Sequence, residues 1–216
     1  MDPQLIARYR SFLEQVLTPH RLQHSLGVMQ VMGELAEIYA LDREQALVAG
    51  LLHDAGKDLS PARQAQIVGE AGIEIHYPCD RDYLLYLHGP AGAYLVRKEL
   101  GISDALILDG ISMHTYYGDG ANFTAPLLWC LRFSDILEPN RNWSKVRWLR
   151  AGAERLRETV YAGRIAEGAF LETGWLIQWF RAAGFPVHPN MRRVYRELSA
   201  RLGLDESFLE TPGGRH

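Results

Sequence analysis

The stretch Ala46-Leu47-Val48-Ala49-Gly50-Leu51-Leu52-His53-Asp54-Ala55-Gly56-Lys57 leads from an apolar run to an imidazole, a carboxylate and an amine. Residues 46–52 are typical of a buried helix, and Asp42 followed three positions later by Gln45 has the form of a capping box that begins it. Polar side chains at the end of a core helix indicate a functional site. An equally simple interpretation of Asp54 and Lys57 is that they cap or solvate the helix end.

Related side chains recur at four other positions, each on or beside an expected helix: His24, His88, His114 and Asp135. A single histidine in such a place is more often a surface, capping or turn residue than a ligand. Asp135 differs, because it lies in an apolar helix of about residues 125–137, and burial of an unpaired carboxylate is costly. Its partner could be an arginine, Arg132 or Arg141, or a metal ion.

Apolar residues recur at three- and four-residue steps through most of the chain, which predicts amphipathic helices throughout. Proline and glycine residues indicate the helix ends, and no alternating strand pattern or tandem repeat interrupts the series. We therefore expect an all-α fold with one domain over residues 1–204. Its core would cover about residues 20–140 and a C-terminal helical part about residues 144–204, followed by a tail at 205–216.

The composition argues against several classes of protein. A formal net charge of −3 and a pI near 6.2 give no general affinity for nucleic acid or anionic lipid. Cys79 and Cys130 lie far apart without metal-binding spacing, so we expect neither a disulfide nor a zinc–thiolate site. The sequence has no signal-peptide core and no membrane-spanning apolar run. We expect a cytoplasmic protein that binds neither nucleic acid nor a membrane.

The segment His88-Gly89-Pro90 is expected to precede a helix, since proline suits the first helical turn. Such a helix end presents unpaired N–H groups and a partial positive charge, which favour phosphate. The simpler interpretation is that His88 only caps the helix or forms its turn. Further along, Ser103 is expected to cap a helix that ends at His114, where a glycine-rich loop over residues 116–121 begins.

Together these residues suit metal-assisted hydrolysis. Two imidazoles and two carboxylates would surround a divalent metal, those of His24, His53, Asp54 and Asp135. Mixed nitrogen and oxygen ligands suit iron, manganese or zinc. Neutralising charge for phosphate, or a second metal position, would come from Lys57, His88 and His114. We therefore expect hydrolysis of a phosphoester or a phosphoanhydride.

The order His24, His53-Asp54, Asp135 resembles the H…HD…D pattern of the HD-domain metal-dependent phosphohydrolases, an all-helical superfamily. One branch, the YqeK family, is more similar still. Four stretches within about residues 8–202 carry this resemblance: Arg21-Leu22-Gln23-His24-Ser25-Leu26-Gly27-Val28, residues 49–57, Leu87-His88-Gly89-Pro90-Ala91-Gly92-Ala93, and Asp135-Ile136-Leu137-Glu138-Pro139-Asn140-Arg141. Members of that family are symmetrical bis(5′-nucleosyl)-tetraphosphatases, which cut diadenosine tetraphosphate into two ADP molecules with a bound iron.

The resemblance implies a role for each matched residue. The metal ligands would be His24, His53, Asp54 and Asp135. The catalytic groups would be Asp54, Lys57, His88 and His114. The substrate would contact Lys57, His88, His114, Asp135 and Arg141, together with backbone donors of the turn at Gly89. Arg141 suits phosphate because its charged fork is planar and permanent.

The resemblance also implies an HD-domain helical bundle with a nucleotide as its small-molecule partner. The metal would be iron, with manganese or zinc as alternatives, and a second metal at His88 and His114 stays open, as does a homodimer. The chain departs from the family pattern where Tyr116–Gly120 lengthens a turn, where Trp129 replaces a lysine and where Ser134 replaces an alanine. These changes flank the expected nucleotide site. Two alternatives therefore stay open: an HD enzyme for another substrate, such as a nucleoside monophosphate or cyclic dinucleotide, and a nucleotide-binding domain without turnover.

Overall fold

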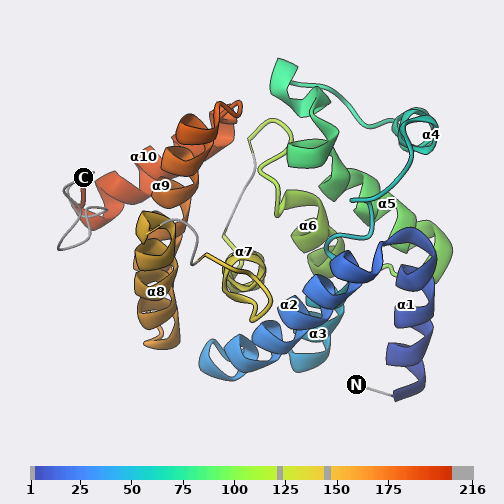
Figure 1. The fold of residues 1–216 in the computed structure, drawn as a ribbon, viewed down its shortest axis with the longest axis horizontal. Helices are drawn as coiled ribbons and strands as arrows, with labels where there is room; N and C mark the ends of the chain where they lie inside the picture. Colours follow the sequence, from blue (N-terminus) through green and yellow to red (C-terminus); the bar gives the residue numbers. More distant parts are fainter. Residues whose placement is uncertain (1–2, 121–123, 144–146, 206–216) are drawn as a thin grey trace. The chain divides into compact units, whose positions relative to one another are not determined.

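The structure, a computed structural model, describes residues 3–120, 124–143 and 147–205 (Figure 1). Helices dominate these residues and no strand occurs among them, which confirms the all-α expectation. The α-helices are α1 (Pro3–Val16), α2 (Pro19–Ile38), α3 (Arg43–Leu52), α4 (Pro61–Ala71), α5 (His88–Leu100), α6 (Ala105–Met113), α7 (Pro126–Leu137), α8 (Arg147–Tyr161), α9 (Ile165–Ala183) and α10 (Pro189–Leu202). A 3₁₀ helix, η1 (Pro78–Arg81), and a π-helix, η2 (Tyr83–Leu87), precede α5.

The chain divides into two compact units, Met1–Asn140 and Arg141–His216. The boundary falls close to the one expected between the core and the C-terminal helical part. The expectation of one domain over residues 1–204 stays a prediction, and the expected tail lies outside the described residues except for Asp205. None of the described helices is long and apolar enough to span a membrane.

Helix α3 supplies much of the core of the N-terminal unit, because it packs against α1, α2, α6 and α7. The expected burial of its apolar run is confirmed, with Leu51 and Leu52 fully buried and Val48 3% exposed. Burial of one such side chain contributes about 1.5–3 kcal/mol. The helix ends at Leu52, so the residues that follow, His53 and Asp54, lie inside the unit and are themselves buried.

The start of α3 forms only half of the expected capping box. The Asp42 carboxylate accepts a hydrogen bond from the Gln45 N–H at 2.8 Å, as predicted. The Gln45 side chain does not complete the box, because its amide donates to Asp104 at 2.8 Å. Asp104 is the N-cap of α6, one residue beyond the expected Ser103, and accepts from the Ile107 N–H. These contacts join the N-terminal ends of α3 and α6.

The helix N-terminus expected at His88 is not present, which corrects the phosphate-binding argument for this turn. Asp82 caps η2, and η2 runs without a break into α5. The backbone N–H of His88 donates to the Tyr83 carbonyl and is therefore not available to bind phosphate. Gly89 instead serves packing, because a Cβ atom there would lie 2.7 Å from the Ser112 carbonyl of α6. A contact of the Gly89 backbone with substrate stays a prediction without that support.

The C-terminal unit consists of α8, α9 and α10, with α9 packed against both of the others. Aromatic side chains form part of its core: Trp175 is 7% exposed, and its ring centroid lies 4.9 Å from that of Trp143. Pro189 begins α10, with His188 as the N-cap. Gly184 ends α9 in the left-handed conformation, with φ of 72°.

Candidate metal centre

Five helices of the N-terminal unit bring the expected histidines and carboxylates together. His24 comes from α2, His53 and Asp54 follow α3, His88 begins α5, His114 follows α6, and Asp135 lies on α7. The packing of α2 with α3 and α7, and of α6 with α3 and α5, is what unites these segments. The close-packed interior in which they meet explains why positions 111 residues apart can share one ion.

One side of the cluster pairs two imidazoles with Asp135. His24 Nε2 lies 3.0 Å from Asp135 Oδ1, and His53 Nε2 lies 4.0 Å from the same oxygen. Both nitrogens lie 3.8 Å from Asp54 Oδ2. One ligand atom from each of His24, His53 and Asp135 lies within 4.8 Å of the others, which is close enough to hold one metal ion.

The other carboxylate oxygen of Asp54 faces the second pair of imidazoles. Asp54 Oδ1 lies 3.3 Å from His88 Nε2 and 3.7 Å from His114 Nε2, and these two nitrogens are 3.1 Å apart. His53, Asp54 and His114 form a second group that could hold a metal ion. Asp54 therefore belongs to both sides of the cluster.

The outer nitrogens of the four rings are held by oxygen acceptors. His53 Nδ1 lies 2.9 Å from the Gly50 carbonyl, His114 Nδ1 lies 2.6 Å from the Ile111 carbonyl, and His88 Nδ1 lies 3.2 Å from the Tyr83 carbonyl. His24 Nδ1 lies 3.1 Å from Glu138 Oε1. Because a carbonyl or carboxylate oxygen only accepts, Nδ1 of His24, His53 and His114 donates its proton, and these rings turn an Nε2 lone pair toward the cluster. This is the tautomer that a metal ligand needs. His88 Nδ1 also lies 3.3 Å from the Lys57 ammonium, which only donates.

The sequence argument gave Glu138 no role in the site. This side chain is buried, accepts the His24 proton through one oxygen and accepts the Asn140 N–H at 2.6 Å through the other. Burial alone would raise the pKa of Glu138, but these hydrogen bonds outweigh it and lower the pKa below its usual value. Gly27 leaves room for the Glu138 side chain, because a Cβ atom at position 27 would meet Glu138 Oε2. The signal for Glu138 in the sequence was its position three residues after Asp135.

Burial and neighbouring charge favour the protonation states that a metal requires. Burial, only partly offset by Asp54, lowers the pKa of His53 to about 4. Burial and the Lys57 ammonium lower the pKa of His88 to about 3. Burial raises the pKa of Asp54, but the Lys57 ammonium and the neighbouring imidazoles outweigh it and hold the pKa well below 3.8. At neutral pH the cluster therefore offers neutral imidazoles and an ionised carboxylate.

The ring of His53 gives a direct test of whether a metal fits. It is fully buried, and its Nε2 has no hydrogen-bonding partner within the described parts of the chain. A buried polar atom without a partner is costly, and a lone pair in this state suits a cation. The nitrogen and carboxylate donors around it suit iron, manganese or zinc better than magnesium. The residues present therefore fit a divalent transition metal.

Three cationic side chains lie near the cluster, those of Lys57, Arg21 and Arg132. Lys57 Nζ donates to the Leu84 carbonyl at 2.7 Å and lies 3.0 Å from His88 Nε2. Arg21, which the sequence argument did not select, lies 3.7 Å from Asp54 Oδ2, and its spacing of three from His24 on α2 was the signal. Arg132 donates to the His114 carbonyl at 3.1 Å, so it supports the position of that histidine.

Arg141 is the first residue of the C-terminal unit, and its guanidinium carbon lies 5.7 Å from the ring centroid of Trp143. Its contact with substrate stays a prediction.

The loop that departs from the family pattern begins at Tyr116, which is buried with φ of 62° and stacks 3.4 Å from the Arg132 guanidinium. Trp129 is 7% exposed and stacks on Phe133 within α7.

Comparison with known proteins supplies independent evidence. The family model of the HD domain matches residues 21–162. The protein named "Bis(5'-nucleosyl)-tetraphosphatase, symmetrical" from Bacillus subtilis is 35% identical over 142 residues, 66% of this chain and 74% of that protein. The protein of that name from Halalkalibacterium halodurans is 29% identical over 186 residues, 84% of this chain and 90% of that protein.

A solved structure is also similar. The crystal structure of a predicted HD superfamily hydrolase involved in NAD metabolism, from Clostridium acetobutylicum, matches with a TM-score of 0.78 and 29% identity. The match covers 91% of this chain and 97% of that chain. The similarity therefore extends over nearly the whole of both chains.

Proposed function

The chain belongs to the HD domain family, and on this premise we propose that it is a metal-dependent hydrolase that cuts diadenosine tetraphosphate symmetrically into two ADP molecules. The observation that carries the proposal is the buried cluster of four histidines around Asp54, with His24, His53 and Asp135 close enough to hold one ion. The tetraphosphatase names of the relatives support this substrate for this chain.

The proposed metal ligands are His24, His53, Asp54 and Asp135. We propose iron as the metal, with manganese or zinc able to replace it, since the donor set suits all three. When bound, the metal supplies Lewis acidity toward water and toward phosphate oxygens. His88 and His114 are proposed to face the phosphates or to hold a second ion beside Asp54.

Side chains of the cluster are proposed to assist the reaction as well. The Lys57 ammonium, 3.0 Å from His88 Nε2, is proposed to neutralise phosphate charge there. His88 is held by the Tyr83 carbonyl, and its Nε2 lies 3.3 Å from Asp54 Oδ1. Symmetrical cleavage breaks the P–O bond at the central bridging oxygen. The water oxygen joins one ADP, and the bridging oxygen leaves with the other.

Product analysis tests this proposal. Anaerobically purified protein, loaded with iron or manganese, should convert diadenosine tetraphosphate into ADP alone. Asp54→Ala and Asp135→Ala should each abolish this turnover, and circular dichroism should still report a helical fold. ATP and AMP as products, or turnover that persists without metal, would overturn the proposal. The cytoplasmic location, the absence of nucleic-acid binding and a homodimer stay predictions.

A further inference from the structure

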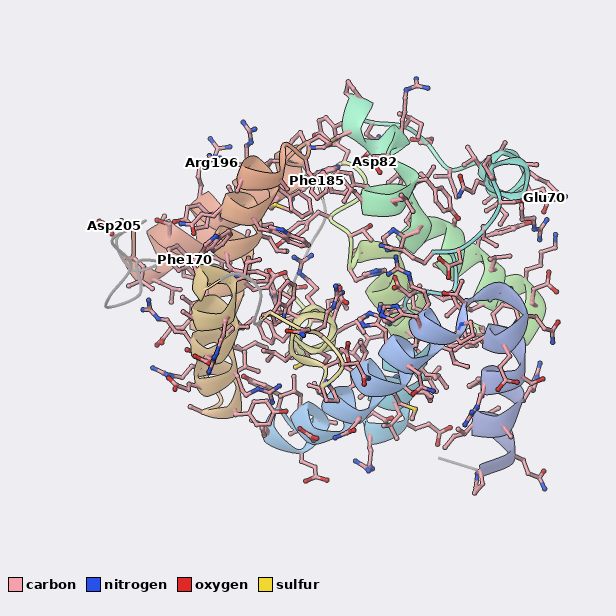
Figure 2. The ribbon with its side chains drawn as sticks, viewed as in Figure 1. Glu70, Asp82, Phe170, Phe185, Arg196 and Asp205 are labelled. Carbon is pink, nitrogen blue, oxygen red and sulfur yellow. The ribbon has the colours of Figure 1, made fainter. Side chains whose placement is uncertain are left out.

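The C-terminal unit contains a cavity of about 440 Å³ between α9 and α10, and the proposed hydrolysis uses none of its residues. The lining residues recur at helical spacing on one face of each helix: Gly174, Ile177, Gln178 and Arg181 on α9, and Arg192, Tyr195 and Arg196 on α10. Because α9 and α10 pack against one another, these two faces are held together. Figure 2 marks Arg196 on α10.

Three guanidinium groups border this cavity, and no carboxylate is among the described residues that line it. Arg181, Arg192 and Arg196 are exposed, and none of them has an ion pair with a carboxylate anywhere in the described parts of the chain. Their neighbour Arg193 is different, because its guanidinium lies 3.3 Å from Glu197. Arg192 and Arg196 are four residues apart on one helix face, where like charges repel. An anion between them would relieve this repulsion.

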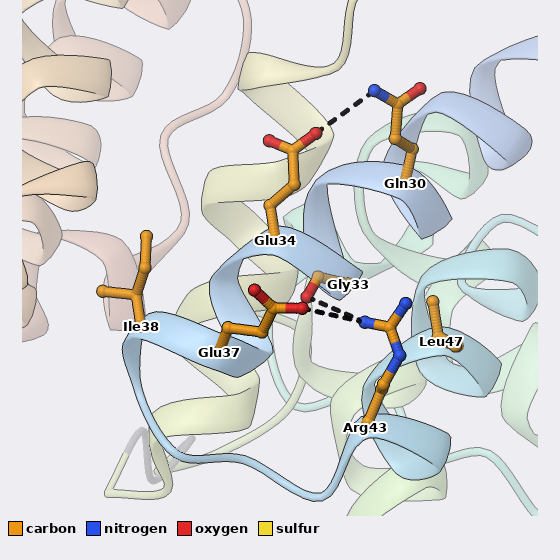
Figure 3. Close-up of a pocket in the computed structure, with 7 residues that line it drawn as sticks. All are labelled: Gln30, Gly33, Glu34, Glu37, Ile38, Arg43 and Leu47. Carbon is orange, nitrogen blue, oxygen red and sulfur yellow. Dashed lines mark hydrogen bonds and ion pairs between the residues drawn. The ribbon is translucent and has the colours of Figure 1, made fainter.

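A cavity in the N-terminal unit shows the opposite arrangement (Figure 3). The one arginine among its described lining residues, Arg43, lies 3.6 Å from Glu37 and donates to the Gly33 carbonyl at 3.3 Å. Glu34 accepts from Gln30 at 3.2 Å. The arginine of that cavity therefore has a carboxylate partner, whereas the three arginines between α9 and α10 have none among the described residues.

The C-terminal unit as a whole is also positively charged. Residues 141–216 contain 13 Lys and Arg residues against 8 Asp and Glu residues, although the full chain carries a formal net charge of −3. A basic unit in an acidic chain concentrates positive potential, which attracts small anions. Arginine forks match phosphate oxygens in a bidentate manner, so phosphate is the anion that three such groups suit best.

The floor of the cavity suits the organic part of a ligand. Ile177 is 6% exposed, Gly174 adds no side chain, and the half-buried Tyr195 is held by stacking on Phe170 with ring centroids 4.8 Å apart. Cavities of roughly 300–1,000 Å³ take small molecules. Three arginines over one such cavity form a compact site, whereas a nucleic-acid strand needs a longer basic path.

We propose that this arginine pocket binds a small molecule with two or more phosphate groups, as in a nucleoside diphosphate. The three guanidinium groups would each contact phosphate oxygens, and Ile177 and Tyr195 would contact the rest of the ligand. The site is separate from the metal centre in sequence and in composition, and its existence does not depend on the proposed hydrolysis.

Calorimetric titration of the full, metal-loaded chain with ADP tests the proposal, because ADP is a product that the proposed enzyme does not consume. We expect a binding event that weakens as salt rises and that inorganic pyrophosphate competes for. Each lost guanidinium contact should weaken it by about tenfold to hundredfold, so Arg192→Gln/Arg196→Gln should abolish this event, while the binding of ADP as a product at the metal centre should remain. The matched control is Arg201→Gln, which removes one charge from the same helix outside the pocket.

The double variant should keep its helical circular dichroism and its turnover of diadenosine tetraphosphate, which separates this pocket from the metal centre. Unchanged ADP affinity in the double variant would overturn the proposal. So would an equal loss of affinity in Arg201→Gln, since general charge would then explain the binding. Tight binding of a single-stranded oligonucleotide that ADP does not displace would assign the arginines to nucleic acid and would also overturn it.

Discussion

At the scale of single residues, Asp54 is the side chain that makes four separate histidines into one site. Its two oxygens face different pairs, His24 and His53 on one side and His88 and His114 on the other. Lys57, five positions after the last residue of α3, adds a positive charge beside His88. Residues just outside this group should therefore change its metal affinity and the pKa of its histidines without binding an ion themselves.

Glu138→Ala should weaken metal binding by about 10- to 100-fold, because the carboxylate that orients His24 and raises its basicity would be lost. Glu138→Gln should give a smaller loss, since an amide oxygen can still accept the Nδ1 proton. Metal affinity measured by competition with a chelator would decide this. Glu154→Ala, which removes an exposed carboxylate, is the control and should bind metal normally. Parental affinity in Glu138→Ala would remove Glu138 from the site.

Lys57→Met should raise the pKa of His88. Burial is the main cause of the low pKa of about 3, and the Lys57 ammonium is the second, so the variant should move partway toward the ordinary value of 6.5. An NMR titration of the His88 ring in the metal-free chain measures the change. Lys98→Met is the control, since Lys98 is exposed and pairs with Glu70. A His88 pKa that stays at the parental value would show that Lys57 does not act on it.

At the scale of elements, the turn after α3 and the start of α5 approach one another through glycine. A Cβ atom at Gly56 would meet the His88 carbonyl and would lie 2.8 Å from the Gly92 nitrogen. These neighbours are backbone atoms of α5 and cannot rotate away. The absence of a side chain at Gly56 therefore lets α5 bring His88 toward Asp54.

Gly56→Ala should destabilise the fold by about 1–3 kcal/mol and should lower turnover, because α5 must shift and carry His88 with it. Urea unfolding and activity assays on one preparation measure both effects. Gly69→Ala is the matched control within α4, where a Cβ atom would meet nothing within 4 Å. That variant should be more stable by about 0.5–1 kcal/mol and fully active. Full activity in Gly56→Ala would contradict the role assigned to this approach.

At the scale of the whole molecule, the buried histidines link stability to pH. The pKa of His53 is about 4 in the folded chain and 6.5 in the unfolded one, so between these values the unfolded state binds more protons. The free energy of unfolding should therefore rise with pH through this window and level off above it. His88, with a folded pKa of about 3, acts in the same direction.

The expected slope for the metal-free chain is about 1.4 kcal/mol per pH unit for each of these two histidines, between roughly pH 4 and 6.5. Urea unfolding at a series of pH values measures it. His53→Asn should remove its share of the slope, because the variant has no proton to bind at that position. Stability that does not change from pH 5 to 7 would mean that the cluster is not buried as described. Bound metal should steepen the loss at low pH, since protons compete for its ligands.

The sequence by itself determined most of the helices and the chemical types in the metal centre. Apolar periodicity and caps such as Asp42 and Ser60 act within a few residues, so local order is enough to reveal them. The burial of His53 and Asp54 followed from the apolar run before them. The proposed ligand set came from residue type together with family resemblance.

Only the tertiary structure decided which residues support that set and which contacts compete with local signals. The π-helix before His88 removed an expected helix N-terminus, because Asp82 caps a helical segment that begins at Tyr83, before the start that Pro90 suggested. Glu138 and Arg21 gained their roles from packing between α2, α3 and α7. Contacts between distant segments depend on how helices pack, and no local pattern records them.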